Sequence, residues 1–404
     1  MSYSKQDVIQ FVKEEDVKFI RLAFCDVFGN QKNISIMDSE LERAFSQGIA
    51  IDASAIKGFG DETHSDLFLH PDPSTLVILP WRPEQGRVVR MYCDITYPNN
   101  EHFECDTRYI LKKAIQEAEK FGYNFYFGAE MEFYLFKLDE NGNLTKEPYD
   151  NAGYMDIAPF DKGENVRREI CLTLEQMDIY PESSHHEEGP GQNEIDFRYS
   201  SPLEAADNAL TFCSVVKAIV DKNGIVADFS PKPLDNAPGN GLHINFSVKS
   251  SNSKDILPNT IAGILNYISD MTIFLNRHER SYKRLGNNKA PSYISWSKEN
   301  RSQLIRIPAA FGEFKRAELR SPDPLANPYL AFALIIYAAI DGINNNLKLP
   351  EAADINFFTA SQEILDKYQK IPGSIEEAIK VAKNSNFINK HLPKAIISSY
   401  CNLK

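Results

Sequence analysis

Four segments of the chain alternate apolar and polar residues with a period of two, which is the pattern of a strand buried on one face. They span residues 125–133, 192–199, 242–247 and 316–320. In each segment the polar face carries carboxylates, an imidazole or guanidinium groups. One such strand is ordinary at a protein surface, but four together are typical of the lined interior of an open barrel.

The N-terminal quarter of the chain predicts a small, mostly antiparallel α+β unit. We expect a helix at 4–15, a hairpin of strands 17–26 and 31–36, and further strands at 75–81 and 88–95. Asp106 precedes an apolar stripe with helical spacing and is expected to cap that helix. We therefore predict two domains, at 1–102 and 103–404.

The larger domain mixes strands with helices. Helices are expected at 205–221, 261–277 and 328–344, and in the C-terminal part from Ile375. The stretch at 328–344 is strongly apolar, so we predict that it is buried. The whole chain is thus expected to belong to the α+β class.

Composition and charge restrict the possible partners. The chain has 404 residues, 43% of them apolar and 25% charged, which is typical of soluble globular proteins. Its net charge of −12 argues against a nucleic-acid partner, because phosphate backbones call for a basic surface. No apolar run approaches the roughly 20 residues that span a bilayer, so no membrane association is predicted. Six cysteines without CxxC spacing favour reduced thiols, and we expect a cytoplasmic protein.

The chain supplies an oxygen-rich set of candidate metal ligands. The set contains five glutamates and one histidine: Glu130, Glu132, Glu187, Glu194, Glu318 and His243. Carboxylates with at most one imidazole suit hard cations such as Mg²⁺ or Mn²⁺. The set is large enough for two neighbouring ions, one at a nucleotide's phosphates and one at the phosphoryl acceptor. For any single pair of these glutamates, a solvated strand face is the alternative interpretation.

Arginines are frequent in the last third of the chain. The candidates for anion binding are Arg284, Arg301, Arg306, Arg316 and Arg320. Guanidinium groups bind carboxylates and phosphates through two parallel hydrogen bonds, and local basic islands in an acidic protein suit a small anionic substrate. A solvated basic surface strip is the alternative. Asp323 is interpreted as a turn former, and Asp52, taken alone, as a loop aspartate.

Several motifs follow one another along nearly the whole chain. They are Gly-Ala-Glu-Met-Glu-Phe at 128–133, His-His-Glu at 185–187, Pro-Gly-Gln-Asn-Glu at 190–194, Asn-Gly-Leu-His at 240–243, Asn-Arg-Ser at 300–302 and Arg-Ala-Glu-Leu-Arg-Ser-Pro-Asp-Pro at 316–324. In order and spacing they resemble the glutamine synthetase family of the bacterial type I class.

The resemblance implies an N-terminal β-grasp domain and a catalytic domain with an open, antiparallel, metal-lined β-barrel and surrounding helices. It also implies a ligase that uses ATP to join L-glutamate and ammonium into L-glutamine through a γ-glutamyl phosphate. Mg²⁺ or Mn²⁺, two or more per site, would be the cofactor and ATP the co-substrate. The subunits would form a homo-oligomer, a hexameric ring or a dodecamer, with active sites between neighbours.

The same resemblance implies a role for each candidate. One metal ion would be held by Glu132, Glu187 and Glu194, and the other by Glu130, His243 and Glu318. Glutamate and the phosphoryl group would be bound by Arg284, Arg301 and Arg320, with Gly239 against the amino acid. The nucleotide side would contain Ser247, Arg306 and Arg316. Asp52 would arrive from the adjacent subunit to bind ammonium, and would be catalytic together with Arg284 and Arg301.

The amine side departs from the family pattern. The flap at 285–291 is one residue short and has Lys289 where glutamate is expected, and Pro238 stands where an asparagine is expected. The C-terminal tail is also short by about one helix. Because a cation at Lys289 would repel ammonium, two alternatives stay open. They are a γ-glutamyl ligase for an organic amine and a non-catalytic paralogue; the presence of all six candidate metal ligands disfavours the second.

Overall fold

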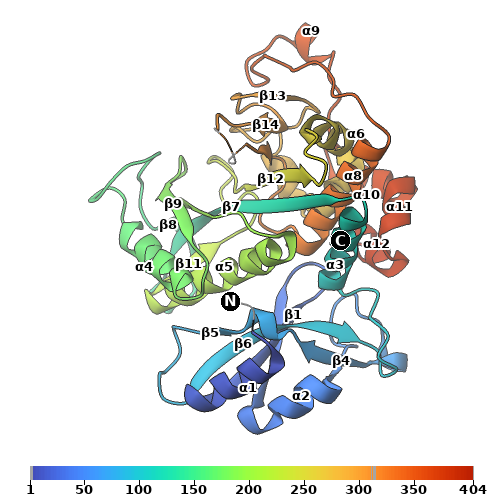
Figure 1. The fold of residues 1–404 in the computed structure, drawn as a ribbon. Helices are drawn as coiled ribbons and strands as arrows, with labels where there is room; N and C mark the ends of the chain where they lie inside the picture. The colour runs from blue at the N-terminus through green and yellow to red at the C-terminus, as the bar shows by residue number, and fades with distance from the viewer. Residues whose placement is uncertain (1–2, 311, 313–314, 404) are drawn as a thin grey trace.

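The computed structural model describes residues 3–310, 312 and 315–403 and contains two β-sheets with helices packed around them (Figure 1). The N-terminal part, blue in Figure 1, lies below the larger part. Its strands are β1 (Val17–Cys25), β2 (Gln31–Met37), β3 (Ile49–Asp52), β4 (Asp66–Pro71), β5 (Val77–Ile78) and β6 (Arg87–Thr96). They form one sheet of order β2-β1-β6-β4-β3, with β5 beside β6.

Two helices pack on this sheet, α1 (Lys5–Glu14) and α2 (Leu41–Gln47). The predicted helix and hairpin are confirmed, and Ser4 caps α1 by accepting a hydrogen bond from the Asp7 backbone. The pairing is antiparallel except between β1 and β6, which run parallel. The strand expected at 75–81 is wrong in length, because Pro73–Thr75 forms a 3-10 turn held by Asp72. Only Val77 and Ile78 pair with β6.

The second sheet contains all four alternating segments. Its strands are β7 (Tyr123–Leu138), β8 (Leu144–Pro148), β9 (Pro181–His186), β10 (Gln192–Phe197), β11 (Ile225–Asp228), β12 (Leu242–Ser250), β13 (Trp296–Lys298), β14 (Ile305–Ile307) and β15 (Ala317–Leu319). The order is β13-β14-β15-β12-β7-β10-β9, with β8 and β11 also paired to β7. Only β13 and β14 pair in parallel among these strands. The predicted strands at 125–133 and 242–247 are therefore confirmed, and those at 192–199 and 316–320 are present but shorter, as β10 and β15.

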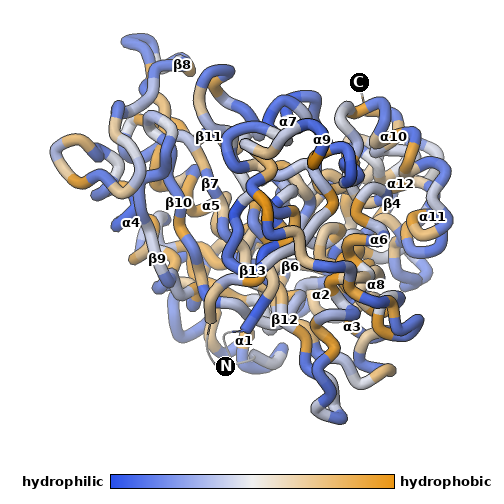
Figure 2. Tube along the Cα trace, turned by 90° about the horizontal axis from the view of Figure 1, so that it is seen from above, coloured by the Kyte–Doolittle hydropathy of each residue, from blue (hydrophilic) through white to orange (hydrophobic). Residues whose placement is uncertain are grey.

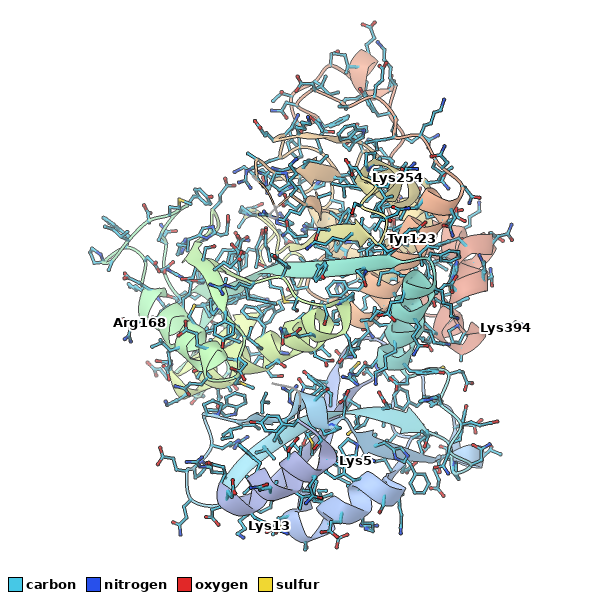
Figure 3. The ribbon with its side chains drawn as sticks, viewed as in Figure 1. Lys5, Lys13, Tyr123, Arg168, Lys254 and Lys394 are labelled. Carbon is cyan, nitrogen blue, oxygen red and sulfur yellow. The ribbon has the colours of Figure 1, made fainter. Side chains whose placement is uncertain are left out.

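Helices surround the second sheet. They are α3 (Thr107–Lys120), α4 (Glu164–Glu175), α5 (Pro202–Lys222), α6 (Leu257–Leu275), α7 (Glu279–Arg284), α8 (Pro328–Asn344), α9 (Gln362–Leu365), α10 (Ile375–Asn384), α11 (Asn386–His391) and α12 (Lys394–Cys401). Figure 3 labels Tyr123 at one end of β7 and Arg168 on α4 toward its other end. The strand β7 thus crosses the larger part, between β10 and β12.

The predicted helix at 328–344 is confirmed as α8, and its side chains are almost all buried. Figure 2 shows largely hydrophobic colouring along α6 and α8. These helices approach closely at Gly263, where a Cβ would lie only 2.1 Å from the Ala338 carbonyl oxygen. None of the helices in the described part is long and apolar enough to cross a bilayer. The six cysteines are all free thiols.

Buried ion pairs join the two parts of the molecule. Arg108 on α3 is 3% exposed and binds Asp72 and Asp94 of the N-terminal part. The same guanidinium binds Asp207 on α5, which also accepts a hydrogen bond from the Tyr329 hydroxyl on α8. Because every charge in this network has a partner, it holds the small sheet in a fixed position on the larger part. The exact division at residues 102 and 103 stays a prediction.

Candidate active site

Strand register brings the candidate ligands together. Glu130 on β7 is paired with His243 on β12 at one side and Asp196 on β10 at the other. Glu132 is paired with Glu194 in the same way. Directly opposite residues on neighbouring strands have Cβ atoms about 5 Å apart and share a face. The alternation seen in the sequence therefore becomes a single acidic surface across β10, β7 and β12.

The first group of candidate ligands is Glu130, His243 and Glu318, whose ligand atoms lie within 4.8 Å of one another. His243 Nδ1 is 3.4 Å from Glu130 Oε2 and 3.5 Å from Glu318 Oε1. Asn245 donates a hydrogen bond of 2.6 Å to the other oxygen of Glu130 and so fixes its carboxylate. The three residues assigned to one ion are thus brought together, and their metal binding stays a prediction.

Glu318 is buried and lies between two arginines. Arg306 donates to its Oε2 at 2.9 Å and Arg320 to its Oε1 at 2.5 Å. Burial opposes ionisation, but Arg320, His243 and Arg306 outweigh it and lower the pKa of Glu318 to about 2. The carboxylate is therefore ionised at neutral pH, and each of its oxygens keeps a second lone pair for a cation.

The second group contains Glu132, Glu187 and Glu194. The ligand atoms of Glu132, Glu194 and His243 lie within 4.8 Å of one another. Those of Glu187, Glu194 and His185 form a second such group. His185 Nε2 lies 3.1 Å from Glu187 Oε1 and 3.8 Å from Glu194 Oε1. The structure thus brings all three predicted ligands to the same cavity, with Glu194 common to both groups.

The carboxylates of the acidic surface repel one another, because few positive charges lie among them. Burial raises the pKa of Glu194 well above its usual value, and Asp196 and Glu132 raise it further. Burial and the nearby Glu130 raise the pKa of Asp196 to about 7, and its Oδ1 is buried without a hydrogen-bond partner among the described residues. A divalent cation would remove this repulsion, and carboxylates with one imidazole fit Mg²⁺ or Mn²⁺.

All of these ligand-group residues except the buried Glu318 line a cavity of about 770 Å³. Its wall also contains Gly239 and every arginine assigned to anion binding: Arg284, Arg301, Arg306, Arg316 and Arg320. The volume suits a small-molecule site. Acidic and basic walls thus face a common space, as expected for a site that binds both cations and anions.

The arginines are held by different local structures. Arg301 is exposed at a turn in which the Asn300 side chain accepts a hydrogen bond from the backbone of Ser302. Arg320 is anchored on Glu318, and Arg316 Nε donates to Asn245 at 2.8 Å. The buried Nε atoms of Arg306 and Arg320 have no hydrogen-bond partner among the described residues. Two unpaired guanidinium donors are thus buried next to the cavity that both arginines line.

Two glycines permit the close approach of backbone and side chains beside Arg284. A Cβ on Gly239 would lie 2.3 Å from the Pro231 carbonyl oxygen, and one on Gly241 would lie 2.8 Å from His243 Nε2. Arg284 is buried and donates to the Ser321 carbonyl oxygen at 2.8 Å. A side chain at either glycine would fill the space beside these groups.

A smaller pocket adjoins the main cavity at Glu130 and Arg316. Ser247, predicted to lie on the nucleotide side, lines it together with Tyr126 and Tyr199. Their rings are 6.1 Å apart in an edge-to-face arrangement. Ser247 thus lies outside the main cavity, in a pocket that shares Glu130, Asp196 and Arg316 with it.

Asp52 lies outside the cavity of its own subunit. It ends β3 on the surface, where the Ser54 hydroxyl and backbone hydrogen-bond to it and lower its pKa. Lys289, in contrast, lines the cavity and forms an ion pair with Glu188. The lysine side chain is therefore directed to a partner that also lines the cavity, not away from the site.

Some contributors were not proposed from the sequence. Gln192 donates a hydrogen bond of 3.0 Å to Glu132 Oε2, Asn245 holds Glu130, and Asp196 and His185 belong to the ligand groups. The alternation already placed Asn245 and Asp196 on the ligand faces, so that signal was available. His185 and Glu188 follow only from the pairing of β9 with β10 and from the fold around it.

Comparison with known proteins agrees with this arrangement. Residues 16–98 match the model of the glutamine synthetase β-grasp domain, and residues 104–404 match that of its catalytic domain. The chain is 43% identical to a glutamine synthetase of Clostridium saccharobutylicum over 98% of its own length and 93% of the relative's. For a Methanosarcina mazei glutamine synthetase the identity is 45%, over 98% and 92%.

Solved structures show the same fold. Plasmodium falciparum glutamine synthetase superposes with a TM-score of 0.86 at 24% identity, covering 99% of this chain and 95% of the other. A protein named GmaS in complex with ADP gives a TM-score of 0.89 at 24% identity, over 98% and 94%. The predicted class, a β-grasp domain followed by this catalytic domain, is confirmed, and the chain belongs to the glutamine synthetase family.

Proposed function

We propose that the 770 Å³ cavity is the active site of an ATP-dependent glutamate–ammonia ligase. The observation that carries this proposal is the meeting of two carboxylate groups around His243 with five arginines in one cavity. Membership of the glutamine synthetase family makes the chain an enzyme of ATP-dependent glutamine formation. The roles of individual residues, the metal and the assembly are the parts proposed here.

The chemistry explains why both walls are needed. A carboxylate is a poor electrophile, and transfer of the ATP γ-phosphoryl group onto the γ-carboxylate of glutamate creates phosphate as a leaving group. Two divalent ions, Mg²⁺ or Mn²⁺, would supply charge neutralisation and Lewis acidity when bound by Glu130, His243, Glu318 and by Glu132, Glu187, Glu194. Arg301 and Arg320 are proposed to bind the glutamate carboxylate and the phosphoryl oxygens.

Other residues bind and orient the substrates. Arg320 is held against Glu318, so its remaining donors are positioned before substrate arrives. Arg284 and Gly239 are proposed to contact the amino acid, and Arg306, Arg316 and Ser247 the nucleotide. Ammonia then displaces phosphate from the acyl phosphate, after ammonium has given a proton to the Asp52 carboxylate of a neighbouring subunit. Asp52 of a neighbouring subunit is proposed as the group that binds ammonium, which calls for a ring-shaped homo-oligomer.

The proposal is tested by phosphate release from ATP with Mg²⁺ or Mn²⁺ and L-glutamate, with and without ammonium, while glutamine is quantified. We expect release to depend on all components and to equal the glutamine formed. Release without ammonium dependence, and without glutamine, would contradict it. Methylammonium in place of ammonium tests the second candidate, a ligase for an organic amine, which stays open because Lys289 lines the amine side of the cavity.

A further inference from the structure

An ion pair lies at the mouth of the cavity. The Lys289 ammonium is paired with the Glu188 carboxylate, and Lys289 Nζ is 5.8 Å from the centroid of the Tyr154 ring. All three residues line the cavity. Glu188 directly follows Glu187, and its backbone N–H donates to Glu187 Oε2 at 2.9 Å. The chain's own cation thus lies between a carboxylate and an aromatic face, one residue from a candidate metal ligand.

The backbone directs Lys289 to this position. Asn288 and Lys289 both have left-handed conformations, with φ of 44° and 65°, which is uncommon for residues other than glycine. The turn is closed by hydrogen bonds from Gly286 N–H to the Ala290 carbonyl and from Ala290 N–H to the Asn287 carbonyl, of 2.8 and 3.0 Å. The direction of the lysine is therefore set by a hydrogen-bonded turn.

The contacts of Lys289 are those that a free ammonium would make. A carboxylate beside an aromatic ring attracts cations, and a primary ammonium on a side chain has the same donors as an amine in solution. The side chains of Lys289 and Glu188 are 54% and 36% exposed. Water-accessible ion pairs are weak, so an amine at sufficient concentration can replace the lysine.

We propose that Glu188 is a second carboxylate, besides Asp52 of a neighbouring subunit, that receives the amine co-substrate, and that Lys289 is an internal competitor that sets the KM for ammonium. The carboxylate is supplied by Glu188, which contacts the lysine at position 289 within the cavity. This inference rests on the proposed function, ATP-dependent ligation of an amine to glutamate. It adds a specificity-determining pair to that reaction.

The first test is K289M in the full-length enzyme. We expect the KM for ammonium to fall roughly two- to fivefold, which is the change in affinity that loss of a water-accessible ion pair produces. The KM for glutamate should change much less. K283M removes the same charge from α7, where the Lys283 side chain has no ion pair within the described ranges, and is the matched control. An unchanged or increased ammonium KM in K289M would overturn the inference.

The isosteric variant E188Q and the double variant complete the test. E188Q is expected to raise the KM for ammonium, and K289M/E188Q to behave like E188Q, because the lysine competes only for that carboxylate. Independent, additive effects would overturn the inference. Its failure is distinct from that of the proposed function: a wild-type enzyme without amine-dependent turnover refutes the function, whereas an active wild type with unshifted variants refutes only this pair. Methylammonium is assayed in parallel as a second probe.

Discussion

His243 Nδ1 lies 3.4 Å from Glu130 Oε2, although 113 residues separate the two side chains along the chain. The antiparallel register of β12 on β7 places them directly opposite each other. Neither residue alone indicates a metal site, because a histidine or a glutamate on a strand is common. Their juxtaposition with Glu318 makes an oxygen-rich group that suits Mg²⁺ or Mn²⁺.

Removing one charge from this group should weaken metal binding. In E130Q the neutral amide keeps the size of the side chain but no longer offers an anionic ligand. We expect the affinity for Mn²⁺, measured by titration of the free-ion EPR signal, to fall at least about tenfold. E140Q, which changes an exposed glutamate, is the control. Equal affinities of E130Q and wild type would show that Glu130 does not bind the ion.

The approach of Gly241 to the site predicts a loss of activity with little loss of stability. In G241A the new Cβ would lie 2.8 Å from His243 Nε2 and 2.9 Å from Arg284 Nη2, so both side chains must shift. Displacement of catalytic groups by about 1 Å costs on the order of 100-fold in rate. In G373A the Cβ would meet Glu377 only at an ordinary 3.6 Å. Similar kcat values for the two variants would contradict this prediction.

Arg301 and Arg320 should separate function from stability. R320A leaves the buried Glu318 carboxylate with one arginine instead of two, and we expect a loss of about 2–3 kcal/mol in the free energy of unfolding. Arg301 is exposed and forms no ion pair within the described ranges. R301A should therefore change the free energy of unfolding by less than about 0.5 kcal/mol. Thermal unfolding at one subunit concentration measures both.

Phosphate release measures the other half of this prediction. Because Arg301 is proposed to bind the transferred group, R301A should lose most of its activity although it stays folded. Wild-type turnover in R301A, or equal thermal stability of R320A and wild type, would contradict the roles given to these arginines.

His391 predicts a loss of stability on acidification. Its ring stacks on Tyr337 with centroids 4.0 Å apart, and burial, with a smaller effect of Lys390, lowers its pKa from 6.5 to about 4. At pH values between about 4 and 6.5, His391 is protonated in the unfolded chain but stays neutral in the folded chain. Stability is therefore lost as the pH falls from about 6.5 toward 4, by about 1 kcal/mol at pH 5 after allowance for partial exposure.

The measurement is the difference in Tm between pH 7 and pH 5 for wild type and H391F. The variant keeps an aromatic ring against Tyr337 but cannot take up a proton, so its Tm should fall less. An equal fall in both proteins would mean that other groups cause the acid sensitivity.

Local patterns predicted much of this molecule because they reflect local physics. Alternation identified the strands that carry Glu130, Glu194 and His243, and the apolar run at 328–344 identified α8. The strand predicted at 75–81 was too long: Thr75 belongs to the 3-10 turn Pro73–Thr75, and only Val77 and Ile78 form β5.

Tertiary relationships were beyond the reach of these patterns. The pair of Glu188 and Lys289 joins residues 101 positions apart, on a strand-end loop and a turn that follows α7. The supporting hydrogen bonds from Gln192 to Glu132 depend on the register of β10 against β7. The role of Asp52 depends on a second subunit, because within its own chain it lies outside the cavity.

The central claim is that this cavity activates the γ-carboxylate of glutamate as an acyl phosphate. The most direct measurement uses glutamate labelled with ¹⁸O in its γ-carboxylate, with ATP, Mg²⁺ and ammonium, followed by mass spectrometry of the phosphate released. We predict that one ¹⁸O atom moves into phosphate for each glutamine formed, because the carboxylate oxygen leaves with the phosphoryl group. Phosphate free of label, with glutamine still produced, would contradict the account.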